Sequence, residues 1–172
     1  MRRIRYSVAM SLDGFIAAPN EEIDWIEPDP EVDFAALWAQ FDTFLMGRRT
    51  YEIGIRMMGE KAFRGMKVFV FSRTLKQLEH PRATLLSELN GDWVRGLKAE
   101  SGRDIWLFGG GAMFRSFLDA RLVDTVEVNL VPVLLGDGVP LLPPPYTPAK
   151  LNLLSHNVSR SGRVSLVYEI RQ

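Results

Sequence analysis

Residues 104–117 constrain the possible folds of this chain more than any other stretch. They read DIWLFGGGAMFRSF: an apolar run ends at Gly109, Gly110 and Gly111, and apolar residues then recur at helical spacing. This pattern predicts a buried strand, a tight turn and a helix. Because glycine has no Cβ, the backbone here can approach a ligand, and the N–H groups of the helix start favour a phosphate. A turn that needs glycine only for its geometry is the alternative interpretation.

Two other predicted strands are followed by side chains that suit an anionic ligand. Residues 43–46 form a short apolar run, and residues 67–71 form a longer run that we expect to be buried on both faces. The first run is followed by Gly47, Arg48, Arg49 and Thr50, and the second by Ser72, Arg73 and Thr74. Guanidinium and hydroxyl groups bind phosphate, although surface arginines beside a plain turn are the alternative at the first position.

The order of the predicted elements indicates the fold class. Strands alternate with helices as far as residue 131, and residues 151–158 and 164–170 form a closing pair of strands around Ser161-Gly162. We therefore expect an α/β protein with one domain over residues 1–172. It should have a mixed, mostly parallel central sheet, flanking helices and an antiparallel C-terminal hairpin.

Three local expectations follow from the same patterns. Asp29-Pro30 suits a helix start, with Phe34, Leu37, Trp38 and Phe41 on one buried stripe. Residues 53–65, which hold several glycines and methionines, should be irregular. Residues 123–131 alternate, so that one set should point inward and the other outward. The inward set is Val126, Val128 and Leu130, and the outward set is Thr125, Glu127 and Asn129.

Acidic residues supply the candidate catalytic groups. Asp13 follows the predicted first strand, residues 3–10, and so lies where α/β sheets bind ligands. It is our first candidate for a proton donor or an orienting carboxylate, and a turn aspartate bonded to its own backbone is the alternative. Asp33 and Glu31 are second candidates, because acids in a first helical turn can face a pocket as well as stabilise the helix dipole.

Composition excludes several functional classes. The 172 residues include no cysteine, which removes disulfides, thiolate zinc sites and cysteine nucleophiles, and the two histidines are expected to be structural. The net charge is zero, so we expect neither nucleic acid nor a membrane as partner. No stretch resembles a signal peptide or a membrane span, and a cytoplasmic protein is expected.

The three junctions together predict a dinucleotide. The carboxyl ends of parallel strands meet at one edge of a sheet, where three such junctions fit a long, multiply charged ligand. NAD sites usually bind the ribose with Asp or Glu, whereas an arginine meets the 2′-phosphate of NADP. Residues 72–74 contain an arginine and no acid, which favours NADPH.

Five ordered motifs also carry a family resemblance. SLDGFIA, MGRRTYE, FSRT, LFGGGA and PVLLGDG follow one another over essentially the whole chain. Together they resemble the dihydrofolate-reductase-like family, in the branch related to the C-terminal reductase domain of the bifunctional riboflavin deaminase–reductase. The cysteine-based zinc deaminase part of such proteins has no counterpart here.

The resemblance implies an NADPH-binding reductase with its site at the carboxyl ends of the strands, and often a homodimer. By resemblance, Asp13 would lie near the nicotinamide and substrate. The residues that would hold the cofactor are Gly47, Arg48 and Thr50 for phosphate, Ser72 and Arg73 for the 2′-phosphate, and Gly109, Gly110, Gly111 and Ala112 for the pyrophosphate.

The leading hypothesis is therefore an NADPH-dependent reductase of a small heterocyclic, carbonyl or imine substrate. Riboflavin biosynthesis, with 5-amino-6-(5-phosphoribosylamino)uracil as substrate, is one candidate pathway. The alternatives are a dihydrofolate reductase and a non-catalytic nucleotide-binding protein that acts as a sensor or assembly partner. In the first long loop, Asp24-Trp25-Ile26 stands where a resemblance to folate reductases would require a Pro-Trp pair. This difference argues against dihydrofolate as the substrate.

Overall fold

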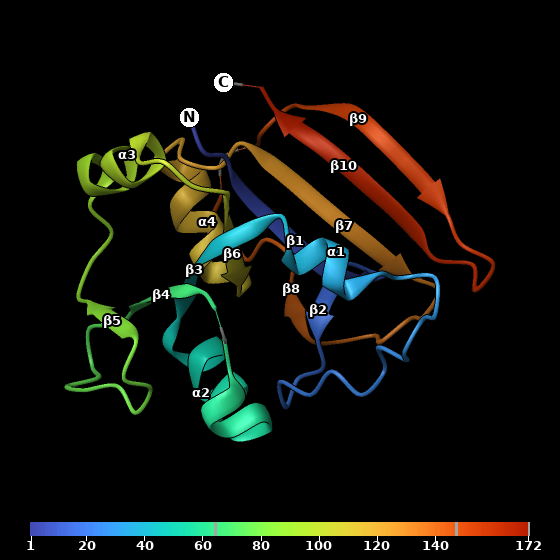
Figure 1. Cartoon of the computed structure of the whole chain (residues 1–172). Helices are drawn as coiled ribbons and strands as arrows, with labels where there is room; N and C mark the ends of the chain where they lie inside the picture. The colour runs from blue at the N-terminus through green and yellow to red at the C-terminus, as the bar shows by residue number, and fades with distance from the viewer. Residues whose placement is uncertain (64, 147, 172) are drawn as a thin grey trace.

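The computed structural model describes residues 1–63, 65–146 and 148–171. Figure 1 shows the strands β1 (Ile4–Ser11), β2 (Phe15–Ala17), β3 (Phe41–Gly47), β4 (Lys67–Phe71), β5 (Ala83–Leu86), β6 (Asp104–Gly109), β7 (Thr125–Val131), β8 (Val139–Pro140), β9 (Leu151–Val158) and β10 (Val164–Ile170). The helices are α1 (Phe34–Trp38), α2 (Arg48–Met58), the short 3₁₀ helix η1 (Gly59–Lys61), α3 (Gly91–Ala99) and α4 (Gly111–Asp119).

Within the described residues, eight strands form the main sheet in the order β5-β4-β3-β6-β1-β7-β10-β9, and β2 pairs with β8 in a small second sheet. In this order, each strand from β5 across the sheet to β7 is parallel to its neighbour. β10 is antiparallel to both β7 and β9. The expected mixed sheet with an antiparallel C-terminal hairpin is therefore confirmed.

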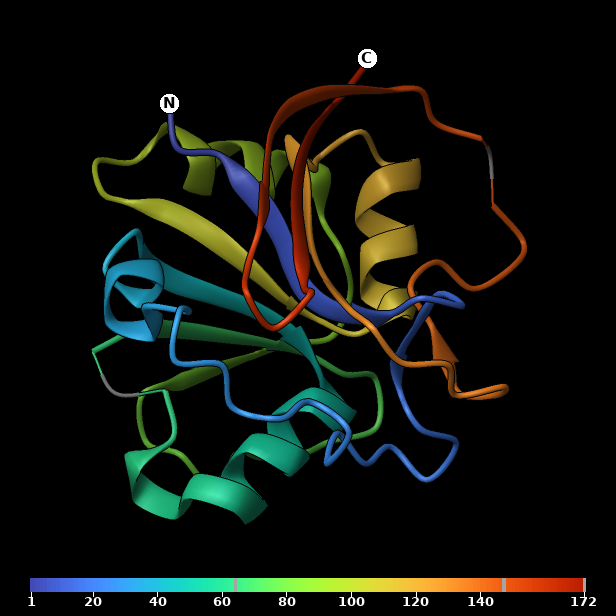
Figure 2. The same cartoon turned by 90° about the vertical axis from the view of Figure 1, so that its right-hand side faces the viewer.

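The central strands are buried on both faces. In β6, Ile105 and Leu107 join a core cluster with side chains from α3 and α4. Trp106, between them, joins a second cluster with side chains from α1 and α2. Figure 2 shows α4 on one side of the strands and α1 on the other. Helix coverage of both faces explains why these strands read as continuous apolar runs.

The helix expected at Asp29-Pro30 begins later. α1 covers only five residues, and its N-cap is Asp33, which accepts a hydrogen bond from the Ala36 N–H at 2.9 Å. Asp29 instead accepts hydrogen bonds from the Glu31 N–H and the Ser161 hydroxyl. The expected buried stripe is also wrong in part, because Phe34 is 55% exposed and Phe41 belongs to β3. Distant partners for Asp29 outweighed its local preference for capping.

Two further expectations are corrected. The stretch expected to be irregular after residue 53 continues α2 as far as Met58 and then forms η1.

Thr125 and Glu127, expected to point outward, are buried. Glu127 pairs with the guanidinium of Arg5, at 2.5 Å from its Nε. Arg5 in turn lies 4.6 Å from the ring centroid of Phe41. The Glu127 carboxylate is therefore buried on that face of β7 because it pairs with the guanidinium of Arg5 instead of facing solvent.

Among the described residues, no helix is long and apolar enough to cross a bilayer. In the same ranges, no cluster of His, Cys, Asp and Glu has the arrangement of a metal site. The peptide bonds Gly109–Gly110 and Pro144–Pro145 are cis.

Candidate functional site

The structure brings the three strand–turn junctions to one edge of the sheet. β4, β3 and β6 are direct neighbours and run parallel, so their carboxyl ends lie together. A Cβ built on Gly47 would lie 3.2 Å from Cγ of Met113, and one built on Gly109 would lie 3.5 Å from Oγ1 of Thr50. The start of α2, the start of α4 and the glycine turn are thus in contact range.

The three glycines of the triplet differ in why the structure has, or does not need, glycine at their positions. Gly109 has φ +125°, a conformation that other residues rarely adopt. Gly111 is buried, and a Cβ there would lie 2.4 Å from the carbonyl oxygen of Pro140. Gly110 is neither strained nor crowded, since nothing lies within 4 Å of its Cβ position. The turn needs Gly109 and Gly111 for its own geometry, and open space lies beside Gly110.

Both helices at this edge start without a side-chain cap. Gly47 is the N-cap of α2 and Gly110 is the N-cap of α4, and neither has a side chain that could accept from the first N–H groups. These N–H groups and the positive ends of two helix dipoles lie at the same edge of the sheet. Ala112, the second residue of α4, is exposed beside them. Such an arrangement suits a diphosphate.

Side chains from the first and second junctions are linked directly. Arg48 donates to the Thr74 hydroxyl at 3.1 Å, and its Nε lies 3.5 Å from Oε1 of Glu52. The Ser72 hydroxyl accepts from the N–H groups of Thr74 and Leu75. These contacts order the tip after β4 against the first turn of α2.

Arg73 lies at the same tip with its side chain exposed to solvent. Within the described residues, its guanidinium has no hydrogen bond or ion pair closer than 4.0 Å. An exposed guanidinium beside two hydroxyls is available to an incoming anion.

Arg49 has an acidic partner that the sequence did not indicate. Its guanidinium lies 2.9 Å from Oε1 of Glu21, in the loop between β2 and α1, and the Arg49 side chain remains 77% exposed. Glu21 has φ +68°, an uncommon conformation for a residue with a Cβ. The predicted phosphate-binding side chain therefore contacts the loop that follows β2.

Asp13 is held by donors from two segments. The Ser11 hydroxyl donates to its Oδ1 at 2.6 Å, and the N–H groups of Leu135 and Gly136 donate to its Oδ2 at 3.0 and 2.7 Å. The Ser11 hydroxyl and the Gly136 N–H hold the pKa of Asp13 below its ordinary value. The carboxylate is therefore ionised at neutral pH and fixes the loop after β7 against the end of β1.

The second-choice acids lie elsewhere. Asp33 caps α1, as described above, and Glu31 accepts from the N–H of Arg160 in the turn between β9 and β10. In the described residues, neither has a hydrogen bond to any of the three junctions.

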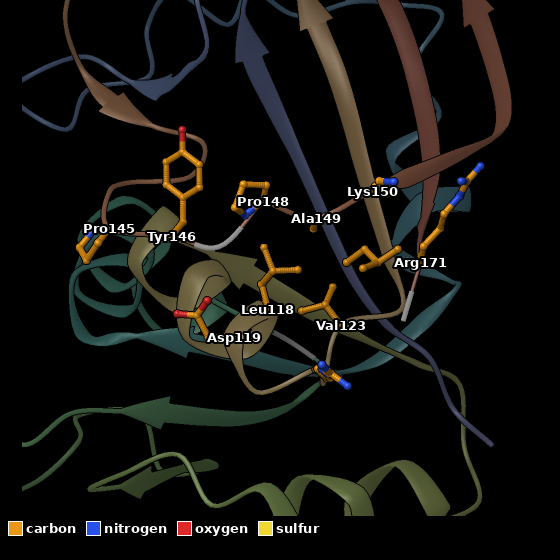
Figure 3. A pocket seen from close by; sticks show the side chains of 11 residues that line it. Leu118, Asp119, Val123, Pro145, Tyr146, Pro148, Ala149, Lys150 and Arg171 are labelled. Atoms are coloured by element: carbon orange, nitrogen blue, oxygen red, sulfur yellow. The ribbon is translucent and has the colours of Figure 1, made fainter.

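A cavity of about 880 Å³ lies away from the junctions. It is at the carboxyl end of α4, next to the segment after Pro145, whereas the glycine turn is at the amino end of that helix. Figure 3 shows Leu118 and Val123 at its centre, with Tyr146 on one side and Lys150 on the other. This cavity is separate from the site that the junctions form.

Comparison with known proteins assigns the family. The sequence profile described as the RibD C-terminal domain matches residues 2–165. The uncharacterized protein YyaP of Bacillus subtilis is 32% identical over 178 residues, which cover 97% of this chain and 94% of that protein. A second protein of B. subtilis, the uncharacterized protein YwjB, is 28% identical and covers 85% of this chain and 86% of its own length.

Solved structures agree with this assignment. A putative riboflavin biosynthesis protein from Shewanella sp. PV-4 superposes with a TM-score of 0.85 at 28% identity, with full coverage of both chains. A diaminohydroxyphosphoribosylaminopyrimidine deaminase/5-amino-6-(5-phosphoribosylamino)uracil reductase from Thermotoga maritima has a TM-score of 0.71 at 18% identity. It is matched over 99% of this chain and 57% of its own. The family expected from the ordered motifs is confirmed.

Proposed function

The chain belongs to the family of the RibD C-terminal domain, and from this premise we propose that it is an NADPH-dependent reductase of a small heterocyclic, carbonyl or imine substrate. The observation that carries the proposal is the open space at Gly110, between two helix starts that no side chain caps. A pyrophosphate there would accept from backbone N–H groups of both helices.

The choice of NADPH over NADH rests on the tip after β4. Arg73, Ser72 and Thr74 supply a guanidinium and two hydroxyls, and residues 72–74 include no acid that would bind a ribose diol. Arg48, already bonded to Thr74, brings a second cation to this position. The 2′-phosphate of NADPH would be recognised by these charges.

NADPH when bound supplies a hydride, and the protein positions it and the substrate. Thr50, beside Gly109, orders the cofactor end of the site. Asp13 acts as an anchoring carboxylate, because its three donors keep it ionised at neutral pH. In this proposal it fixes the loop of residues 131–136 at the end of β1 and gives no proton to the substrate.

We further propose that the reaction belongs to the class carried out by 5-amino-6-(5-phosphoribosylamino)uracil reductases. The support is the family and the likeness over the full length to a putative riboflavin biosynthesis protein. A screen of pyrimidine, pterin and simple carbonyl compounds under NADPH would identify the substrate.

The test is a fluorescence titration of the protein with NADPH and, in parallel, with NADH. We expect tighter binding of NADPH, and R73A should weaken NADPH binding about tenfold while leaving NADH binding unchanged. R115A is the control, because Arg115 is a half-buried arginine that donates to the carbonyl of Pro144 and contacts none of residues 72–74. Failure to bind either nucleotide would disprove the reductase proposal. Binding without oxidation of NADPH by any substrate of the screen would support the non-catalytic alternative.

A further inference from the structure

The cavity at the carboxyl end of α4 has the size of a small-molecule site. Its volume is about 880 Å³, and ligand pockets commonly enclose about 300–1,000 Å³. Leu118, near the end of α4, and Val123, just before β7, lie at its centre (Figure 3). Val123 is buried and Leu118 is half-buried, and Ile170 at the end of β10 also lines the cavity. The centre of the cavity is therefore apolar.

Two cations lie on one side of this apolar centre. Lys150 precedes β9 and Arg171 follows β10, and the N–H of Arg171 donates to the carbonyl of Lys150 at 2.9 Å. The two residues are thus opposite each other on antiparallel segments, and Figure 3 shows both side chains on the same side of the cavity. Like charges in opposite positions repel each other.

No carboxylate offsets this repulsion within the described residues. Neither Lys150 nor Arg171 has an Asp or Glu oxygen within 4.0 Å there. Arg171 donates through Nε to the amide oxygen of Asn152, which leaves its Nη groups for another acceptor. An anion between the two side chains would remove the repulsion and accept from both.

The other charged residues of the lining do not change this balance. Arg121 follows α4 directly, where the helix dipole favours a cation, and it needs no ligand to explain it. Asp119 is exposed, and Figure 3 shows it away from Lys150 and Arg171, on the side of Tyr146. The lining thus has an apolar centre and an uncompensated positive side.

The opposite side of the cavity carries an aromatic ring. Tyr146 is 53% exposed, and its ring stands across the cavity from Lys150 (Figure 3). Pro145 and Pro148 also line this part. Proline has a fixed φ, so this part of the wall has little backbone freedom to lose when a ligand binds. A half-exposed ring beside apolar side chains suits a planar apolar group.

The cavity and the proposed cofactor site lie at opposite ends of α4. The helix has nine residues and is therefore about 13 Å long. The chain from Pro140 to Pro145 runs beside it: this chain crowds Gly111 at the amino end, accepts from Arg115 through the carbonyl of Pro144, and lines the cavity at the carboxyl end. Among the described residues, no member of the three junctions lines this cavity.

A second cavity, of about 870 Å³, lies beside the carboxyl end of α2. Its charged lining residues include both Glu79 and Arg82, and the N–H of Arg82 donates to Nδ1 of His80. Because acid and base occur together, this lining indicates no sign of charge for a ligand.

We propose that the cavity at the carboxyl end of α4 is a second binding site, which takes a small amphipathic anion with a planar apolar body and a phosphate at one end. The body would lie on Leu118 and Val123, against the ring of Tyr146. The phosphate oxygens would accept from Nζ of Lys150 and the Nη groups of Arg171. Two adjacent cations suit a dianion better than a carboxylate with a single charge.

The probe is 1-naphthyl phosphate, titrated by calorimetry into the full chain at low ionic strength without nucleotide. The wild type should bind it with a dissociation constant at or below about 1 mM, as expected for a ligand of this size. 1-Naphthol, which lacks the charge, and inorganic phosphate, which lacks the ring, should each bind at least about fivefold more weakly. Comparable binding of either would overturn the amphipathic class.

K150A/R171A should weaken binding of 1-naphthyl phosphate at least about fivefold, and the difference should shrink at about 1 M salt. Both side chains are exposed, so this variant should fold with a melting temperature equal to or above that of the wild type. R56A/K61A is the matched control, because it removes an exposed arginine and an exposed lysine at the other end of the molecule's helix α2 and in η1. Its affinity for the probe should be unchanged.

Y146A tests the aromatic side of the cavity and should weaken binding about threefold. Tyr146 lies across the cavity from the start of β9, so this variant distinguishes the cavity from the apolar side chains of that strand. Unchanged binding in Y146A would show that the probe lies on β9 instead and would overturn the proposal.

The inference does not depend on the proposed reductase function. Saturation with NADPH should leave the affinity for 1-naphthyl phosphate unchanged, and competition would show that the probe occupies the cofactor site. No binding by the wild type, or equal losses in K150A/R171A and R56A/K61A, would also overturn the second site even if NADPH binds. If NADPH did not bind but the probe bound in a way that requires Lys150 and Arg171, the reductase proposal would fall and this one would stand.

Discussion

Gly110 and Gly111 are adjacent residues with different reasons for lacking a side chain. A Cβ on Gly111 would overlap the carbonyl oxygen of Pro140, whereas a Cβ on Gly110 would enter open space. We expect G111A to cost about 1–3 kcal/mol of stability through overpacking. G110A should fold normally, within about 0.5 kcal/mol of the wild type, but should weaken NADPH binding at least tenfold.

Thermal unfolding and NADPH titration of this pair separate a packing role from a ligand role. Unchanged NADPH affinity in G110A would show that no ligand approaches the backbone there. A G111A variant as stable as the wild type would show that the segment at Pro140 moves aside.

Asp13 gives a prediction with a defined pH dependence. Its pKa is lowered from 3.8 in the folded protein, so its contribution to stability is complete above that value and is lost as pH falls through the lowered pKa. D13N should therefore lower the melting temperature by a few degrees at neutral pH. The difference should close as pH falls through the lowered pKa of Asp13. Melting curves of both proteins from neutral to acidic pH would test this, and a constant difference would contradict it.

At the scale of elements, the connection from β2 to α1 contacts the rest of the protein at two places. Glu21 pairs with Arg49 at the start of α2. Further along, Asp29 accepts from Ser161, and Arg163 donates to the carbonyl of Glu27, so this part of the loop packs against the turn between β9 and β10. The Glu21–Arg49 pair is exposed. The second contact is buried, since Asp29 and Arg163 are 5% and 7% exposed.

In the exposed pair, the Glu21 carboxylate competes with a phosphate for the Arg49 guanidinium. E21Q should strengthen NADPH binding up to about fivefold at low ionic strength, because an exposed ion pair contributes about 0.2–1 kcal/mol. The gain should vanish at about 1 M salt, where screening is strong. Titrations at both salt concentrations would measure it. D92N, which removes the Asp92–Arg95 pair on α3, is the control, and an equal gain in D92N would contradict the competition.

At the scale of the whole molecule, the two edges of the sheet differ. β9 forms one edge and exposes four large apolar side chains: Leu151, Leu153, Leu154 and Val158. An apolar edge strand is an association surface unless it is covered. We propose that a second copy of this chain covers it in a homodimer.

Light scattering at micromolar protein tests the dimer. The wild type should have twice the mass of one chain, and L153K/L154K should be monomeric, because burying two ammonium groups in an apolar interface is costly. T84K, on the opposite edge strand β5, should remain dimeric. A monomeric wild type would contradict the proposal.

The sequence by itself determined the strands of the main sheet and the position of the three junctions, but not the extent of α1 and α2 or the short strands β2 and β8. Apolar runs predicted the buried strands, and Gly47 and the glycine triplet marked where strands pass into helices. These are local signals, because hydrophobic spacing and turn residues act within a few positions of the chain. The ordered motifs also indicated the family that the comparisons confirmed.

Only the tertiary structure decided which residue does what. Asp13 bonds to Gly136, 123 positions away, and Asp29 bonds to Ser161, 132 positions away. The reason for Gly111 lies in the carbonyl of Pro140, and the burial of Glu127 in its pairing with Arg5. Polar side chains and glycines take their roles from whichever groups the fold brings to them, and hydrophobic spacing carries no information about those partners.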